Sequence, residues 1–185
     1  MKKIFFFLLI SLNTFCWAQT QSLDSLKSLV FSEKISDSLK QVSFEQLLFT
    51  LFGSYEFDSL KKFSELSESF SRKINDSSLL SHSLYFQGVC FMSNASFNSA
   101  LYKFKEALPI YENLKSYSWI IACKSQIASL YTTIGQNEKA IKTFKELIKA
   151  SINENSGINF FQIINFHLAI GCLLYTSPSP RDRVR

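Results

Sequence analysis

The feature that most constrains the fold of this chain is an internal repeat with a step of 40 residues. When the chain is shifted by 40 positions, LYFQGVCFMSNASFNSALYKFKEAL falls on KSQIASLYTTIGQNEKAIKTFKELI. Each segment reads as two amphipathic helical patterns joined by a short polar turn. A unit of this kind buries its apolar face only by stacking on its neighbours. The sequence therefore predicts an all-α chain of stacked helix pairs.

The residue types at the repeated positions have a physical reason. Gly88 and Ala128 lie in the first helix of each pair, where a small residue lets the partner helix approach closely. Ala100 marks the close crossing point on the second helix, and Phe104 follows four residues later on the same helix face. The turns SNASFN and TIGQNE contain residues suited to ending one helix and capping the next.

This pattern resembles the tetratricopeptide repeat (TPR) family, which implies a right-handed α-solenoid of antiparallel helix pairs. In the first repeat the matching positions are Leu84, Gly88, Phe91, Ala100, Phe104 and Ala107. In the second they are Ile127, Ala128, Tyr131, Ala140 and Phe144, with Leu147 at the last small position. The unit is longer than the usual TPR, and we expect the extra length in the second helix and in the connection to the next repeat.

The N-terminus has the layout of a secretory signal peptide. MKK is a short basic region, and an apolar run follows from Ile4 to Ala18 with small residues at Cys16 and Ala18. The alternative is an uncleaved anchor, but a spanning helix needs about 20 apolar residues, which is more than this run supplies. We expect cleavage after Ala18 and a mature protein outside the cytoplasm.

The C-terminal residues 172–185, CLLYTSPSPRDRVR, differ in character from the rest. The first 171 residues contain one proline, whereas Pro178 and Pro180 lie close together here and would stop a helix. The string CLLYTSPSPRD resembles the in-frame translation of a common transposase sequencing adapter, which implies a non-native tail and a gene cut inside a repeat. A natural tail is the alternative, and the codons around residue 172 distinguish the two.

These observations divide the chain as follows. We expect a signal peptide at 1–18, an irregular helical capping repeat at 19–76, TPR-like repeats at 77–120 and 121–157, the start of a truncated repeat at 158–171, and a non-native tail at 172–185. Helices are expected near 22–34, 38–52, 57–73, 77–93, 97–114, 117–134, 137–152 and 158–171.

The formal charge of +5 does not indicate a nucleic-acid partner. Without the signal peptide and the tail, 15 basic residues face 14 acidic ones, so the folded part is nearly neutral. Lys139, Lys142, Lys145 and Lys149 form a basic stripe, for which a solvated outer face is favoured over a ligand site. Cys90 and Cys123 are expected to be small buried hydrophobes, although one disulfide remains an alternative in an oxidising compartment.

No catalytic constellation is visible in the sequence. His82 and His167 are isolated, and the chain has no nucleophile elbow, no glycine-rich phosphate loop and no metal-ligand pair. We therefore expect no enzyme activity in this segment, no cofactor and no metal. A kinase domain would belong to sequence beyond residue 171.

The TPR resemblance implies a protein or peptide ligand in a concave groove lined by the first helices. Carried over by position, the groove residues are His82, Tyr85, Val89 and Met92 in the first repeat and Ala122, Ser125, Ser129 and Thr132 in the second. This set lacks the Lys, Asn and Arg clamp for a C-terminal carboxylate. The alternative for Tyr85 and Met92 is packing against the neighbouring unit.

The expected function is protein–protein interaction by an exported domain at the periplasmic or extracytoplasmic face of the inner membrane. The chain resembles the sensory ectodomains of Bacteroidetes-type signal transducers, in which a histidine kinase or a LuxR-type regulator follows. The membrane would be reached only through the signal peptide or a missing downstream helix. The alternative is a free-standing periplasmic TPR scaffold without an output domain.

Overall fold

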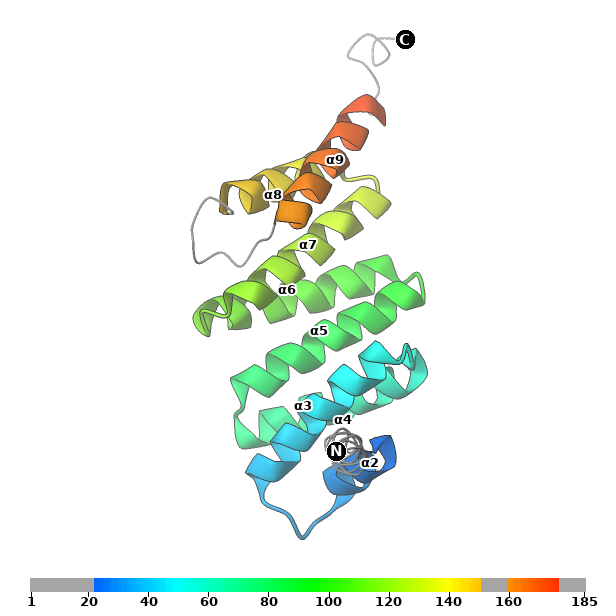
Figure 1. Ribbon diagram of the computed structural model, residues 1–185, viewed down its shortest axis with the longest axis vertical. Helices are drawn as coiled ribbons and strands as arrows, with labels where there is room; N and C mark the ends of the chain where they lie inside the picture. Colours follow the sequence, from blue (N-terminus) through cyan, green and yellow to red (C-terminus); the bar gives the residue numbers. More distant parts are fainter. Residues whose placement is uncertain (1–21, 151–159, 177–185) are drawn as a thin grey trace, which may run out of the picture.

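The computed structural model describes residues 22–150 and 160–176, and every regular element within these ranges is a helix (Figure 1). The first four are α2 (Leu23–Phe31), α3 (Asp37–Gly53), α4 (Phe57–Ile74) and α5 (Ser77–Ser93). The other four are α6 (Phe97–Asn113), α7 (Tyr117–Thr133), α8 (Asn137–Ala150) and α9 (Phe160–Thr176).

The helices form an elongated stack in which each packs against the one before and the one after it. Figure 1 shows α3, α5, α7 and α9 running in the same slanted direction along the stack, with the intervening helices running back. We call α3, α5, α7 and α9 the A helices and α4, α6 and α8 the B helices. The predicted all-α, solenoid-like arrangement is confirmed, and α4 to α7 end within one residue of their predicted bounds.

Identical turns set the regular spacing of the helices. A residue with positive φ occurs every 20 positions, at Tyr55, Asn75, Ala95, Lys115 and Gly135. After each one, the next backbone N–H donates to the carbonyl oxygen five residues earlier, as in Ser96 to Phe91 O at 2.8 Å. This is the bond that closes a Schellman-type helix end.

The 20-residue spacing corrects one expectation about the repeat. Helices α5 and α6 both contain 17 residues, and the connections 94–96 and 114–116 have the same length. The extra length of the unit is therefore shared by both helices. The prediction of a longer connection after the second helix is wrong for the step from α6 to α7.

The small residues at the repeated positions do lie at close helix crossings. A Cβ atom added to Gly88 would lie 2.9 Å from the ring of Phe104, which is itself fully buried. Ala100, Ala107 and Ala140 are also fully buried. The α5–α6 pair therefore packs as closely as its sequence predicts, since only a residue without a side chain leaves room for the ring.

Small serine residues lie where α4 packs on α5. Ser64, Ser67 and Ser71 on α4 are fully buried. The Ser83 hydroxyl donates to Leu79 O at 2.7 Å and lies 2.8 Å from the Ser67 hydroxyl. Because these hydroxyls find partners locally, small polar side chains allow the same close packing without leaving unsatisfied groups.

A polar network joins three consecutive helices beside the serines. The Glu68 carboxylate accepts hydrogen bonds from Gln87 at 2.7 Å and Arg72 at 2.8 Å, and Lys103 lies 3.4 Å away. Burial alone would raise the pKa of Glu68, but these hydrogen bonds and the Lys103 charge together hold it below its usual value. Glu68 therefore stays ionised and ties α4 to α5 and α6.

The buried cysteines do not form a disulfide. Cys90 and Cys123 are both buried free thiols, as their apolar surroundings predicted. Burial raises the pKa of each thiol to about 12, so the reactive thiolate form is scarce at neutral pH.

Two predicted segments fall at or beyond the limits of the described residues. The signal peptide at 1–18 lies outside them, as does most of the predicted tail. Helix α9 continues past residue 171 to Thr176, and Leu173 in this extension is buried. None of the described helices is both long and apolar enough to cross a membrane.

Candidate functional site

The predicted groove residues of α5 and α7 occupy equivalent positions in the repeat register but differ in accessibility. Tyr85 is only 7% exposed, and Val89 and Met92 are half-buried against the core. Ser129 and Thr132 are exposed, and Ser125 is half-buried. We call the surface formed by these positions on successive A helices the A-helix face.

Tyr85 does not serve the predicted ligand surface. Its ring makes edge contacts with Phe104 at 5.2 Å and Trp119 at 5.0 Å between centroids. Burial raises the pKa of its hydroxyl, so it remains neutral. The alternative interpretation, packing against the neighbouring unit, describes Tyr85 correctly, because a buried ring presents almost no surface to a ligand.

An aromatic cluster that joins three A helices covers this part of the face. Phe49 of α3 reaches over α5 to Trp119 of α7, with ring centroids 5.8 Å apart. It also contacts His82 at 5.9 Å and Phe86 at 5.3 Å. Trp119 in turn stacks on Tyr111 at 5.5 Å with nearly parallel rings. We call these six residues the aromatic cluster: Phe49, His82, Tyr85, Phe86, Tyr111 and Trp119.

His82 is a neutral member of the aromatic cluster. Its Nδ1 atom lies 3.6 Å from Glu45 Oε1, which is beyond hydrogen-bond distance. Burial lowers the pKa of His82 to about 4, while burial and the charge of Asp76 raise the pKa of Glu45. At neutral pH the imidazole is therefore uncharged and held by ring contacts.

Sequence reasoning missed the most exposed apolar part of the A-helix face, which belongs to α3. Val42, Phe49 and Phe52 are 46%, 43% and 39% exposed. They occupy the positions of His82, Val89 and Met92 after a step of 40 residues. A step of 40 residues back from the predicted groove positions of the first repeat would have found them.

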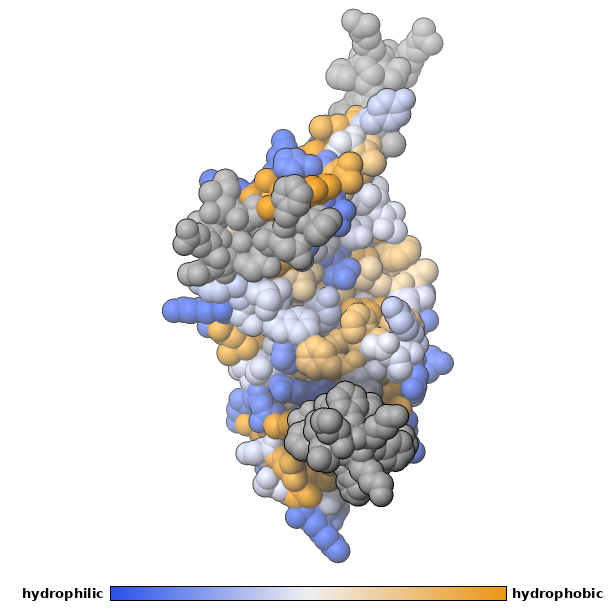
Figure 2. Space-filling model, in the orientation of Figure 1, coloured by the Kyte–Doolittle hydropathy of each residue, from blue (hydrophilic) through white to orange (hydrophobic). Residues whose placement is uncertain are grey.

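The two ends of the A-helix face differ in chemistry. At the α3 end it is apolar, whereas at α7 it presents hydroxyl groups from Ser129 and Thr132. Thr132 donates its hydroxyl hydrogen to Ala128 O at 3.2 Å, which leaves the oxygen free to accept. Figure 2 shows apolar side chains gathered over the middle of the molecule, where Figure 1 draws α5 and α7.

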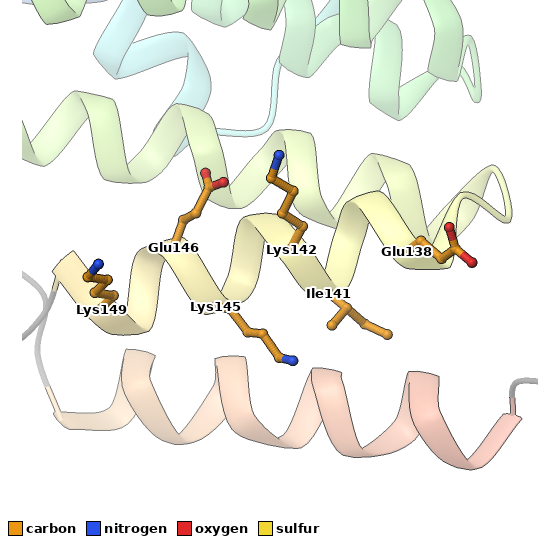
Figure 3. A pocket seen from close by; sticks show the side chains of 6 residues that line it. All are labelled: Glu138, Ile141, Lys142, Lys145, Glu146 and Lys149. Atoms are coloured by element: carbon orange, nitrogen blue, oxygen red, sulfur yellow. The ribbon is translucent and has the colours of Figure 1, made fainter.

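A second candidate surface is the basic stripe on α8. A shallow hollow of about 460 Å³ is lined by Glu138, Ile141, Lys142, Lys145, Glu146 and Lys149. Figure 3 shows that Lys142 and Glu146 point to one side of α8 whereas Ile141 and Lys145 point to the other. Because the side chains diverge and two carboxylates lie among the amines, this hollow has no convergent binding geometry.

Within residues 22–150 and 160–176, no group of three or more His, Cys, Asp or Glu side chains is arranged to hold a metal ion. Among the described residues, His82 and Cys90 lie on α5, Cys123 lies on α7, and His167 and Cys172 lie on α9.

No family model and no curated protein matches this sequence. Among solved structures, the fold is similar to the crystal structure of BtubC (BKLC) from P. vanneervenii, with a TM-score of 0.69 and 13% sequence identity. The alignment covers 82% of this chain and 62% of that chain, so this chain spans about three fifths of that protein's length. At this identity the likeness concerns the fold alone, and it supports an all-helical, repeat-like architecture.

Proposed function

We propose that this chain is an exported protein–protein interaction module of the TPR type, which binds a protein or peptide on the A-helix face. The proposal combines the 40-residue repeat with a stack of helix pairs whose small and aromatic residues meet at the helix crossings. A stack of this kind offers an extended surface formed by equivalent positions on successive units.

The observation that carries the proposal is the exposed apolar group on α3. Val42, Phe49 and Phe52 are each at least 39% exposed and lie on one helix, Phe49 and Phe52 on neighbouring turns and Val42 two turns before Phe49. Half-buried Val89 and Met92 occupy the equivalent positions on α5. Contiguous apolar side chains on a protein surface commonly mark an interaction site.

The chemistry of the face suggests an uncharged ligand segment. Glu45 is the single charged residue among the equivalent positions of α3, α5 and α7, and it lies beside neutral His82. An amphipathic helix or an extended peptide would place apolar side chains against α3 and α5. Its polar groups would then lie near the hydroxyls of α7.

Selection of binding peptides from a displayed random library would test the proposal. Peptides selected on the purified chain should be rich in apolar residues, and calorimetry should give dissociation constants in the micromolar range. Phe52→Lys should weaken binding at least tenfold, because it places an uncompensated charge in the contact. Phe52 is partly exposed, so the substitution leaves most of the core intact.

Tyr102→Lys is the matched control. Tyr102 is a large, 67% exposed apolar residue on the B helix α6, away from the A-helix face. The Tyr102→Lys variant should bind the selected peptides with the affinity of the unchanged chain. Equal loss of binding in both variants, or in neither, would refute the assignment of the ligand surface.

We further propose that the module is exported and forms the sensory or scaffolding part of a longer signal-transduction protein. This second proposal rests on the N-terminal apolar run and on the resemblance of the sequence to the sensory ectodomains of Bacteroidetes-type signal transducers. Expression in a bacterium with an export pathway should yield a periplasmic product whose N-terminal mass begins at Gln19. The sequence of the natural gene beyond codon 171 distinguishes the two alternatives. A membrane span followed by an output domain would support the sensor, and a stop codon after a few more repeats would support the free-standing scaffold.

A further inference from the structure

Glu45 interrupts the exposed apolar residues of α3 on the A-helix face. The residues three positions before it and four and seven positions after it share one side of the helix with it, and these are Val42, Phe49 and Phe52. In the repeat register Glu45 has the position of Tyr85 on α5. Its side chain is 29% exposed, so a ligand that lies across the three apolar residues also covers the Glu45 carboxylate.

Glu45 has no cationic partner in the described part of the chain. Among these residues no lysine or arginine lies within ion-pair distance of it, and the one basic side chain that does is His82, with Nδ1 3.6 Å from Oε1. The imidazole is neutral at pH 7, because burial lowers the pKa of His82 to about 4. Burial and the charge of Asp76 raise the pKa of Glu45, since both disfavour its ionised form.

A carboxylate of similar exposure on the B helices is compensated. The Glu106 side chain is 30% exposed, and its Oε1 atom lies 2.9 Å from the Arg72 guanidinium. Glu68 accepts hydrogen bonds from the same guanidinium, and its pKa is held below the usual value. The direction of the pKa change is thus opposite for Glu45 and Glu68, and the carboxylate without a cation is the one on the A-helix face.

A fully uncharged ligand would leave Glu45 in an unfavourable state. An ionised carboxylate without a partner is costly to remove from water, and its protonation at neutral pH also costs free energy. A Lys or Arg side chain of the ligand avoids both costs. Its aliphatic stem would lie along the ring of Phe49 while its charged end reaches the carboxylate of Glu45.

We propose that the ligand of the A-helix face is an apolar peptide segment with one Lys or Arg residue, which pairs with Glu45. Apolar residues on one side of this cation would contact Val42, and those on the other side would contact Phe49 and Phe52. The inference rests on the proposed function, because it assigns one contact within the same ligand surface. It adds a single charge to the otherwise uncharged segment that the rest of the face favours.

Peptide selection from two displayed libraries tests the proposal. One library is fully random, and the other lacks Lys and Arg. On the unchanged chain the random library should yield apolar peptides with one Lys or Arg, and these should bind at least tenfold more tightly than the best peptides of the second library. On Glu45→Gln this difference should disappear while both sets of peptides remain apolar. Circular dichroism should show unchanged helix content, because glutamine has nearly the shape of glutamate.

A substitution in the peptide measures the pair directly by calorimetry. In the tightest peptide selected on the unchanged chain, norleucine replaces the Lys or Arg and removes only the charged end. This replacement should weaken binding about tenfold to the unchanged chain and less than about twofold to Glu45→Gln. Glu65→Gln is the matched control, because it removes an exposed carboxylate from the B helix α4 with the same change in net charge. It should respond to norleucine as the unchanged chain does.

The outcomes separate this inference from the proposed function. Apolar peptides that lose binding with Phe52→Lys but carry no enriched Lys or Arg would overturn the pairing with Glu45 and leave the proposed function standing. An equal effect of norleucine on the unchanged chain and on Glu45→Gln would assign the cation to another group and overturn the pairing as well. If neither library yields a peptide that responds to Phe52→Lys, both proposals fail.

Discussion

At the scale of single residues, Gly88 shows how one missing side chain sets the distance between two helices. The ring of Phe104 is fully buried and would lie only 2.9 Å from a Cβ atom at position 88. We expect Gly88→Ala to lower the free energy of unfolding by about 1–2 kcal/mol, since overpacking outweighs the gain of about 1 kcal/mol in helix propensity. Urea denaturation followed by circular dichroism measures this difference.

Gly53 provides the control for this substitution. It lies at the end of α3, and an added Cβ there meets no atom within 4 Å. Gly53→Ala should leave stability unchanged or raise it by up to about 1 kcal/mol. If the two variants lose stability equally, the close contact between Gly88 and Phe104 does not limit the packing.

His82 makes stability depend on pH. Its pKa is lowered to about 4 by burial, whereas an unfolded histidine titrates near 6.5. As pH falls from about 6.5 to 4, the unfolded chain takes up a proton that the folded chain does not. The free energy of unfolding should therefore fall by about 2–3 kcal/mol over this window, and be fully retained above it.

His82→Phe should remove most of this pH dependence, because phenylalanine keeps the ring contacts and carries no titratable group. Denaturation curves between pH 4 and 7.5 give the comparison. His167→Gln, on the exposed side of α9, serves as the control and should keep the slope of the unchanged chain. A slope that persists in His82→Phe would assign the effect to another group.

At the scale of helices and turns, strained residues occur in an otherwise regular arrangement. Four of the five turn residues with positive φ are not glycine, and Ala95 is one of them with φ of 54°. The left-handed conformation costs a residue with a Cβ about 1 kcal/mol relative to glycine. Ala95→Gly should therefore raise the free energy of unfolding by about 0.5–1 kcal/mol.

The converse substitution tests the same argument in the equivalent turn. Gly135 has φ of 76° and an open environment, so Gly135→Ala should lower stability by about 1 kcal/mol without steric overlap. Chemical denaturation of both variants measures the pair. Changes of the same sign in the two turns would contradict an origin in backbone strain.

The sequence predicted the helices well because their ends recur with the repeat. Helices α5 and α6 begin at their predicted residues, since polar and small residues mark each turn. The turn residues themselves were harder to predict. Ala95 and Lys115 adopt positive φ although neither residue type favours it, so the requirement comes from the helix packing on both sides.

The candidate site was predicted less completely than the fold. The register predicted Val89, Met92 and Ser129 as groove positions, and all three are at least partly exposed. It left packing against the neighbouring unit open as the alternative for Tyr85, but it did not identify Trp119 of α7 as a ring that packs against it. Such contacts between distant parts of a chain leave no periodic trace in the sequence.

At the scale of the whole molecule, the Phe49–Trp119 contact is unusual for a stack of repeats. In such stacks each unit contacts mainly its immediate neighbours, and stability is nearly a sum of neighbouring terms. Here a ring of α3 touches a ring of α7, with α5 between them. We therefore expect the aromatic cluster to couple the unfolding of units that are not adjacent.

A double-mutant cycle with Phe49→Leu and Trp119→Leu measures this coupling. We expect an interaction energy of about 0.5–1.5 kcal/mol, the range for aromatic pairs in contact. The cycle of Phe31→Leu with Trp119→Leu is the control, because Phe31 packs on Phe63 of α4, away from the aromatic cluster. That cycle should be additive within about 0.5 kcal/mol. If the Phe49 cycle is also additive, the units unfold with neighbour coupling alone, and the cluster stabilises only the helices on which its members lie.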